Sequence, residues 1–355
     1  MRTAVLVSAP VDPTAKSKAM HGLRPRQDYD ALAEELGATL ITPFSGRGKR
    51  GGALGKSAAL LKSAWQGFAR RGQYDTIVSD VDRVGVLLAA LLKITRSRKR
   101  HVVVCHGKMA HPVDRRLVRL LRLHTHMDRL ICYGPEIAEQ LQRALPVSPS
   151  RIITLRHAVD HRFWKPLETE ARPLVVSAGL FQRDYPTLVE AIREMGVTLE
   201  VAAHSPWVPE KERALTDASL PDNVRLSSHD YASLRELYAS ALCVAVPLVE
   251  HDTQAGSLVV YEALAMGKPV IVTRTRGQAA MGLVQEGETG FYVEPGDVEG
   301  WRRAVSFLHE HPDEAMRMGQ NARRVVEEGL NLDAFVEEMA VVVKGAAASS
   351  PVPSP

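Results

Sequence analysis

The chain has 355 residues, 45% hydrophobic and 24% charged, which is the composition of a globular protein long enough for two domains. No stretch approaches the roughly 18 consecutive apolar residues of a membrane-spanning helix, and the N-terminal "MRTAVLVSAPVDP" has too short an apolar run for a signal peptide. The net charge of +4 conceals an asymmetry: residues 1–160 hold 27 Lys and Arg against 13 Asp and Glu, whereas residues 161–355 hold 18 against 28, so the first half should attract anions.

Strand-like and helix-like segments alternate along the first half. Short β-branched runs are separated by segments with helical spacing, such as "QDYDALAEELG" and "GPEIAEQLQRAL". Apolar strands that alternate with helices are typical of a parallel sheet covered on both faces. The predicted strands of this half are residues 3–9, 38–44, 75–80, 101–107, 129–134 and 151–157.

Two stretches of this half concentrate its basic residues, "KITRSRKRH" at 93–101 and "DRRLVRLLRLHTHMDR" at 114–129. In the second stretch, leucines at 117, 120, 121 and 123 interleave with arginines at 115, 116, 119 and 122, which predicts a basic amphipathic helix. Such a helix either packs within its domain with solvated arginines or faces a membrane surface or an anionic acceptor. No aromatic-rich motif accompanies the charge, so nucleic acid is not an expected partner.

The same alternation continues in the second half, with predicted strands at 174–179, 198–204, 223–228, 243–248 and 269–273. A polar, proline-containing segment at 160–173 separates the halves. The sequence therefore predicts an α/β protein of two doubly wound, Rossmann-like domains facing a cleft. We place them at 1–165 and 166–330, followed by a closing helix at 331–345 and a disordered tail at 346–355.

The three cysteines, Cys105, Cys132 and Cys243, each lie in an apolar strand-like run. An odd number without metal-ligand spacing predicts buried thiols in a reducing cytoplasm. The Asp80-x-Asp82 pair is the one candidate metal motif, but its place at a strand end favours a structural polar loop.

The stretch "HDTQAGSLVVYEALAMGKPVIVT" at 251–273 predicts a helix, a turn and a buried strand. The first N–H groups of a helix have no acceptor within it, so Ala255, Gly256, Ser257 and Leu258 predict an anion site at the helix start. Glu262 follows in the apolar part of that helix, where a buried carboxylate needs hydrogen-bond donors.

Residues 247–297 resemble the C-terminal signature of the retaining GT-B glycosyltransferases of family 4. Glu262 falls on the second Glu of that signature, and "ALAMGKPV", "GETG" and "PGD" follow in the family's order. The segments "VVVCHG", "RHAVDHRFWKP" and "SAGLFQRDYPTLVEA" are weaker matches, also in order. The resemblance implies the GT-B architecture, with an acceptor-side domain at 1–165 and a nucleotide-sugar donor domain at 166–330.

The same resemblance implies a hexosyltransferase that uses a UDP- or GDP-sugar and retains the anomeric configuration, with a glycan, lipid or small-molecule acceptor. Glu262 would accept the ribose hydroxyls and Arg183 would neutralise the diphosphate. His106 and Gln254 would be the catalytic residues. The donor-binding residues would be Gly179, Arg183, Gln254, Ala255, Gly256, Ser257, Leu258 and Glu262.

Three positions depart from the family pattern. The first Glu of the signature is Gln254 here, Gly179 is followed by Leu180 rather than by an arginine, and no glycine-rich loop follows the first strand. These departures keep two alternatives open, a nucleotide-sugar epimerase or phosphorylase of the same fold and a catalytically silent binding subunit.

We expect no cofactor and no metal, because the helix start and Arg183 would replace a cation at the diphosphate. The expected partners are the nucleotide-sugar donor and an acceptor that the sequence does not identify. The basic first half, including Lys16, Lys18, Arg24 and Arg26, favours an anionic or membrane-associated acceptor, although the same loop can simply be solvated. We therefore expect a cytoplasmic protein, with peripheral contact at the inner face of the membrane as the alternative.

Overall fold

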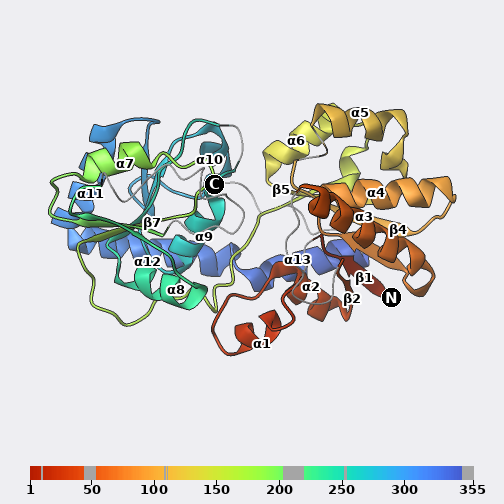
Figure 1. The fold of residues 1–355 in the computed structure, drawn as a ribbon, viewed down its shortest axis with the longest axis horizontal. Coiled ribbons are helices and arrows are strands. Elements are labelled where there is room, and N and C mark those ends of the chain that lie inside the picture. The colour runs from red at the N-terminus through yellow and green to blue at the C-terminus, as the bar shows by residue number, and fades with distance from the viewer. Residues whose placement is uncertain are drawn as a thin grey trace. The chain divides into compact units, whose positions relative to one another are not determined.

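The computed structural model describes residues 1–8, 11–43, 53–107, 109, 111–202, 220–251 and 254–345 (Figure 1). The chain forms two compact units. Unit 1 comprises residues 1–20, 26–157 and those from 332 onward, and unit 2 comprises residues 21–25 and 158–331. The tail expected to be disordered, 346–355, lies outside the described residues.

Unit 1 is built on a parallel six-stranded sheet in the order β2-β1-β3-β4-β5-β6. The order reverses direction between β1 and β3, which makes that point the topological switch of the sheet. The strands are β1 (Thr3–Leu6), β2 (Thr39–Ile41), β3 (Thr76–Ser79), β4 (Arg100–Cys105), β5 (Arg129–Tyr133) and β6 (Ile152–Leu155).

Helices cover the sheet of unit 1, and one of them comes from the far end of the chain. The C-terminal helix α13 lies beside α2 (Figure 1). Arg26 forms an ion pair with Asp333 of α13 at 2.9 Å. The helices are α1 (Ala15–Met20), α2 (Asp28–Leu36), α3 (Ala53–Ala69), α4 (Asp82–Ile94), α5 (Pro112–Leu120), α6 (Pro135–Ala144) and α13 (Leu332–Lys344).

Unit 2 repeats the plan with a second parallel sheet, in the order β12-β11-β10-β7-β8-β9. Its switch point lies between the central strands β7 and β10. The strands are β7 (Leu174–Ala178), β8 (Thr198–Ala202), β9 (Val224–Ser227), β10 (Cys243–Val246), β11 (Val270–Thr273) and β12 (Gly290–Val293).

Alternation along the strands of unit 2 creates a hydrophobic core on each face of its sheet. Val176, Val244 and Val246 pack into one core, whereas Val175 and Ala245 pack into the other. The covering helices are α7 (Tyr185–Ile192), α8 (Tyr231–Ser240), α9 (Ser257–Ala265), α10 (Arg276–Met281), α11 (Val298–Glu310) and α12 (Pro312–Gly329).

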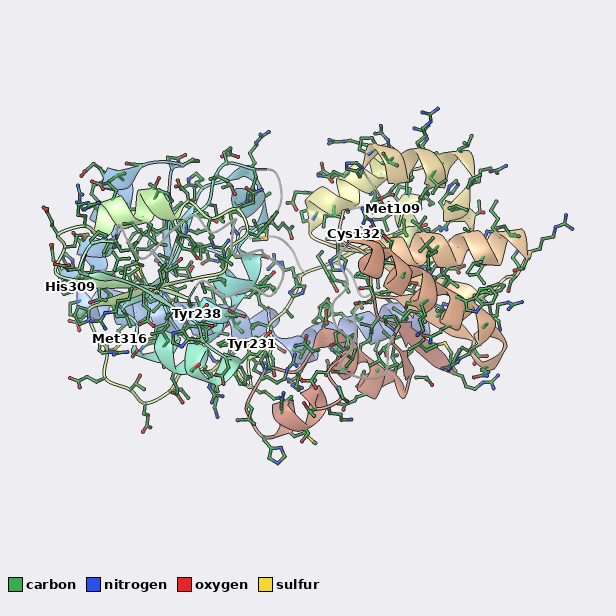
Figure 2. All side chains as sticks on the ribbon, in the orientation of Figure 1. Met109, Cys132, Tyr231, Tyr238, His309 and Met316 are labelled. Carbon is green, nitrogen blue, oxygen red and sulfur yellow. The ribbon has the colours of Figure 1, made fainter. Side chains whose placement is uncertain are left out.

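The structure confirms the predicted α/β class with two doubly wound sheets, and all three cysteines are buried free thiols, with Cys132 labelled in Figure 2. The observed division differs from the predicted domains. Unit 1 gives way to unit 2 after residue 157 rather than 165, and the helix expected to close the molecule belongs to unit 1. Strand β12 was not among the predicted strands.

The basic helix predicted over 114–129 is wrong in its extent. Helix α5 ends at Leu120, Arg122 adopts a left-handed conformation with φ of 48°, and a short 3-10 turn follows at Leu123–His126. Because the chain turns there, Leu123 is buried, whereas Leu117 and Leu120 remain 44% and 75% exposed. Leu117 and Leu120 of α5 are therefore not buried in the core of unit 1.

Gly319 in α12 provides a test of packing in unit 2. A Cβ at this position would lie 2.2 Å from the carbonyl oxygen of Gly267, in the turn after α9. We expect Gly319→Ala to lower the free energy of unfolding by about 2 kcal/mol, because the helix must move away from a rigid backbone atom.

The measurement is the midpoint of urea denaturation at unchanged slope. Gly329→Ala is the matched control, because it lies in the same helix and its Cβ would meet nothing within 4 Å. Equal midpoints for the two variants would contradict the close contact between α12 and the turn.

Candidate functional site

The loops after β7 and β10 meet at the switch point of unit 2, where ligands bind in sheets of this kind. Arg183 pairs with Leu248 in an antiparallel bridge. The backbone N–H of Asp184 donates to the carbonyl oxygen of Pro247 at 3.1 Å, and that of Val249 donates to Gln182 at 3.1 Å. Two loops distant in sequence are thus held together at the carboxyl edge of the sheet.

Arg183 is the buried charge of this edge. The residue is only 9% exposed. Its Nε and Nη2 atoms donate to the carbonyl oxygen of Ala178 at 3.0 and 2.9 Å. Nη1 donates to Phe181 at 3.1 Å. Burial lowers the pKa of Arg183 from its ordinary value, while Tyr185, Tyr238 and Glu262 act in the opposite direction.

Arg183 is not a surface arginine paired with the neighbouring Asp184. Asp184 instead caps helix α7: its Oδ1 accepts from the N–H of Thr187 at 3.3 Å and its Oδ2 accepts from the Thr187 hydroxyl at 2.7 Å. The guanidinium of Arg183 is therefore positioned by backbone carbonyl groups, and these bonds do not use all of its N–H groups.

Two glycines with positive φ border that guanidinium. Gly179 has φ of 88°, and a Cβ there would lie 2.8 Å from Nη2 of Arg183. Gly256 has φ of 81°, and its Cβ would lie 2.7 Å from Cγ1 of Val246 and 3.4 Å from Nη1 of Arg183. Both positions require glycine for conformation and for space, so the sequence-predicted residues Gly179, Arg183 and Gly256 are indeed brought together.

Helix α9 begins at the same place, with Gly256 as its N-cap. The N–H of Ser257 donates to the carbonyl oxygen of Gln254 at 3.3 Å, and Val260 N–H donates to Gly256 at 3.1 Å. Among the described residues, no backbone acceptor is found for the N–H groups of Leu258 and Val259, as is usual for the first turn of a helix. The predicted anion site therefore has fewer available N–H donors than expected, because the N–H of Ser257 already donates to Gln254.

The residue just before the start of α9 is held by Gln278, which no sequence motif marks. Gln278, 1% exposed in α10, donates from Nε2 to the carbonyl oxygen of Ala255 at 2.6 Å. The Gln254 side chain is half-buried, and residues 252–253 before it lie outside the described part of the chain.

Glu262 lies between one and two turns further along α9 and is half-buried. Its Oε2 accepts a hydrogen bond from the hydroxyl of Tyr238 in α8 at 3.3 Å. Burial raises the pKa of Glu262 to about 8, and the Tyr238 hydrogen bond and the charge of Arg183 offset only part of that effect.

Aromatic residues that no sequence motif marks complete the surroundings of Glu262. Tyr238, labelled in Figure 2, is fully buried and its ring lies 5.7 Å from that of Trp164. The hydroxyl of Tyr185 donates to the carbonyl oxygen of Gly179. In the sequence, tyrosines at helical spacing are indistinguishable from ordinary core residues, so no signal marked them.

His251 is a further residue that the sequence did not single out. It follows β10 in the same loop, and both ring nitrogens are shielded from solvent without a hydrogen-bond partner among the described residues. Shielded polar atoms without partners are costly, so this imidazole is suited to meeting a bound polar group.

In unit 1, His106 follows the carboxyl end of β4, where its residue is exposed. Its Nε2 lies 3.1 Å from the carbonyl oxygen of Asp80, and its ring meets the edge of Tyr133 at 5.1 Å between centroids. The backbone N–H donates to the buried carboxylate of Asp82 at 2.7 Å, and Met109 N–H donates to the same group at 3.3 Å. Asp82 thus braces the loop that carries His106.

The two carboxyl groups of the Asp80-x-Asp82 pair have different surroundings, since Asp82 accepts the backbone N–H groups of His106 and Met109. Within the described part of the chain, no group of three or more His, Cys, Asp or Glu side chains is placed to hold a metal ion. Burial, with a smaller contribution from Asp28, raises the pKa of Asp80 to about 8. Asp80 lines a small cavity with Tyr133 and Phe335 at the carboxyl edge of the unit 1 sheet.

The basic residues of the 9–29 loop have partners within the protein. Lys16 pairs with Glu34 at 2.5 Å, Lys18 with Asp12 at 3.1 Å, and Arg26 with Asp333. Arg24 lies over the ring of Tyr231, 5.6 Å from its centroid. This loop therefore offers less free positive charge than its sequence indicates.

Two family models match the chain. The model for group 1 glycosyl transferases matches residues 174–311, and the model for glycosyltransferase family 4 matches residues 23–163. The first match covers the strands and loops that form the switch point of unit 2, and the second covers most of unit 1.

Curated relatives match over parts of their length. The MMP alpha-(1->4)-mannosyltransferase of Mycolicibacterium hassiacum is 24% identical over 278 residues, which cover 72% of this chain and 66% of the relative. The lipopolysaccharide core biosynthesis glycosyltransferase LpsE of Rhizobium meliloti is 29% identical over 188 residues, covering 50% and 53%. The chain thus matches less than two thirds of the length of either relative.

Solved structures share the fold across almost the whole chain. The Anabaena protein HepE in complex with UDP-glucose superposes with a TM-score of 0.69 at 16% identity, covering 97% of this chain and 99% of HepE. Sucrose-phosphate synthase from Thermosynechococcus elongatus gives a TM-score of 0.70 at 17% identity, covering 97% and 98%. The chain is a glycosyltransferase family 4-like protein with the two-domain GT-B fold.

Proposed function

We propose that the protein is a retaining glycosyltransferase that moves a hexosyl unit from a UDP- or GDP-sugar to a glycan, lipid or small-molecule acceptor. The observation that carries the proposal is the switch point of unit 2, where a buried arginine and a helix start lie beside two positive-φ glycines. The names of the two curated relatives, a mannosyltransferase and a lipopolysaccharide core glycosyltransferase, support the reaction class. HepE, solved with UDP-glucose, supports the donor class.

Electrostatics at this edge suit a departing diphosphate. When the bond between sugar and diphosphate breaks, negative charge grows on the leaving group, and fixed positive potential there lowers the barrier. Arg183 is held in place by three hydrogen bonds to backbone carbonyl groups, so little reorganisation is needed on binding. The free N–H groups at the start of α9 add to that potential. In our proposal these groups act without a metal ion.

Glu262 is the proposed ribose ligand, because a carboxylate accepts two hydroxyl hydrogen bonds at once. Burial raises the pKa of Glu262 more than the Tyr238 hydrogen bond and the charge of Arg183 lower it, so further donors would favour the charged form. The hydroxyls of a ribose would supply them.

The remaining groups are assigned to the sugar and the acceptor. Gln254, one turn before α9, would bind the transferred sugar through its amide, and His106 would contact the reacting sugar from unit 1. With an amide in place of a carboxylate at Gln254, we propose that the leaving phosphate assists deprotonation of the acceptor on the same face.

For the acceptor, we propose an anionic or membrane-associated molecule that approaches unit 1. None of the helices that the structure describes is long and apolar enough to cross a membrane. Helix α5 exposes apolar and basic side chains together, including Leu120 at 75% exposure beside Arg116 and Arg119. This combination suits peripheral contact with an anionic lipid surface.

A catalytically silent binding subunit is the second candidate, favoured by Gln254 in place of the usual Glu and by Leu180 in place of the usual Arg. The two candidates separate in one experiment. The protein is incubated with isotope-labelled UDP- and GDP-sugars and acceptor fractions, and its thermal stability is measured with UDP, GDP, ADP and dTDP. We expect stabilisation by UDP or GDP together with transfer of label. Nucleotide binding without transfer or hydrolysis would favour the silent subunit. Absence of both binding and transfer would contradict the donor site.

The first prediction concerns Glu262→Ala. Loss of a charged acceptor for the ribose should weaken nucleotide binding by roughly 2–4 kcal/mol in a calorimetric titration. Glu236→Ala in α8 is the control, because Glu236 is exposed. Unchanged nucleotide affinity in a folded Glu262→Ala variant would contradict the assignment.

The second prediction follows from the pKa of Glu262, which burial raises to about 8 in the free protein. If ribose binds the ionised form, affinity is limited by the ionised fraction, which grows as pH rises toward 8. We expect nucleotide affinity to increase roughly tenfold or more between pH 6.5 and 8.5.

The matched variant is Glu262→Gln, which keeps the size of the side chain but does not titrate. The ratio of wild-type to variant affinity removes any ionisation of the nucleotide itself. A ratio that stays constant across this pH range would contradict binding by an ionising Glu262.

The third prediction concerns Gln254→Ala. We expect UDP or GDP affinity to stay within about threefold while turnover falls by roughly ten- to a thousandfold, because hydrogen bonds that strengthen only in the transition state affect kcat. Gln254→Glu should remain partly active. Gln285→Ala, at an exposed position, serves as control, and wild-type turnover in Gln254→Ala would refute a role at the sugar.

A further inference from the structure

A basic pocket lies at the amino edge of the unit 1 sheet. Arg100 and Arg129, which line it, are the first residues of β4 and β5. Because the strands are parallel, this edge is opposite the carboxyl edge that carries His106. The cavity has a volume of about 450 Å³ and is lined by Arg98, Lys99, Arg100, Thr125, His126, Asp128, Arg129 and Gly345.

Positive charge dominates the lining. Four cationic side chains face a single carboxylate, that of Asp128, whose Oδ2 already accepts the backbone N–H of His101 at 2.7 Å. Among the described residues, none of the four cations forms an ion pair with a carboxylate. This arrangement differs from the 9–29 loop, where Lys16, Lys18 and Arg26 have acidic partners.

Two of these cations, Arg100 and Lys99, are held by hydrogen bonds to backbone carbonyl groups. Arg100 donates from Nη1 to the carbonyl oxygen of Lys344 and from Nη2 to that of Val342, both at 3.4 Å, at the end of α13. Gly345 allows this approach, because a Cβ there would lie 2.4 Å from Nη2 of Arg100. Lys99 donates from Nζ to the carbonyl oxygen of Tyr74 at 2.9 Å. A cation held in this way loses little freedom when an anion binds.

The histidine of the pocket, His126, adds a polar ring to the wall. Burial, followed by the charges of Lys93 and Arg98, lowers the pKa of His126, and Asp128 opposes this shift. The hydroxyl oxygen of Thr125 lies 3.0 Å from Nδ1 of His126 and adds a polar group to the wall. The pocket thus combines cations with neutral hydrogen-bonding groups, which is the chemistry of an oxyanion site.

We propose that this pocket binds a phosphate-bearing anion, separately from the donor site of unit 2. Guanidinium groups match phosphate oxygens in pairs, and the volume admits a diphosphate or a phosphorylated small molecule. The phosphate belongs either to a soluble molecule or to a lipid headgroup, and the experiment separates these two sources.

The test uses the full chain and the double variant Arg98→Ala/Arg129→Ala. The matched control is Arg70→Ala/Arg143→Ala, which removes the same charge from unit 1 away from the pocket; Arg70 and Arg143 are exposed. Binding of inorganic pyrophosphate is measured by calorimetry. Binding to vesicles is measured by sedimentation, with seven parts phosphatidylcholine to three parts phosphatidylglycerol.

If the ligand is soluble, pyrophosphate affinity should fall at least tenfold in the pocket variant and stay within twofold in the control. If the ligand is a headgroup, only vesicle binding should show that difference. Equal behaviour of both variants toward both probes, or no binding by the wild-type protein, would overturn the proposal. A diphosphate bound only in the donor site of unit 2 would be insensitive to both pairs, so failure here leaves the proposed transferase activity untouched.

Discussion

The buried guanidinium of Arg183 is the constraint on which the ligand edge of unit 2 depends. An arginine away from water needs acceptors, and this one takes them from the loop that carries it, at Ala178 and Phe181. Gly179 has no room for a side chain beside the guanidinium, and Gly256 is confined by Val246 as well as by Nη1 of Arg183. The start of α9 can therefore approach the end of β7, so that a fixed charge and the first N–H groups of a helix come to lie at one edge of the sheet.

The two units use the same sheet topology for different electrostatic purposes. In unit 2 the buried cation Arg183 lies on the carboxyl edge, whereas unit 1 carries acids there, with Asp80 and Asp82 beside His106. Unit 1 also groups four cations, Arg98, Lys99, Arg100 and Arg129, near the amino ends of β4 and β5. The charge asymmetry seen in the sequence is thus a property of particular edges, which explains why a count over whole halves does not locate a site.

Local patterns predicted the fold well, because a parallel sheet requires runs of apolar β-branched residues wherever it is buried on both faces. The eleven expected strands all exist, whereas β12 was missed because "GFYV" is short and follows a glycine-rich turn. The break of the basic helix at Arg122 was also missed, since a left-handed arginine has no sequence signature. The grouping of Gly179, Arg183, Gly256 and Glu262 followed from motif order, but the roles of Tyr238 and Gln278 depend on contacts between distant segments.

Glu262 shows how such contacts change what a motif residue does. The sequence places a glutamate in an apolar helix, and from that alone it is either a costly buried charge or a surface residue. In the structure it has one hydroxyl donor, from Tyr238, and an arginine in the same cluster, yet burial still raises its pKa to about 8. The free protein therefore holds a carboxyl group short of donors close to a guanidinium with donors to spare. A ligand that brings hydroxyls to the first and phosphate oxygens to the second resolves both deficits at once, and a nucleoside diphosphate carries both groups on one molecule.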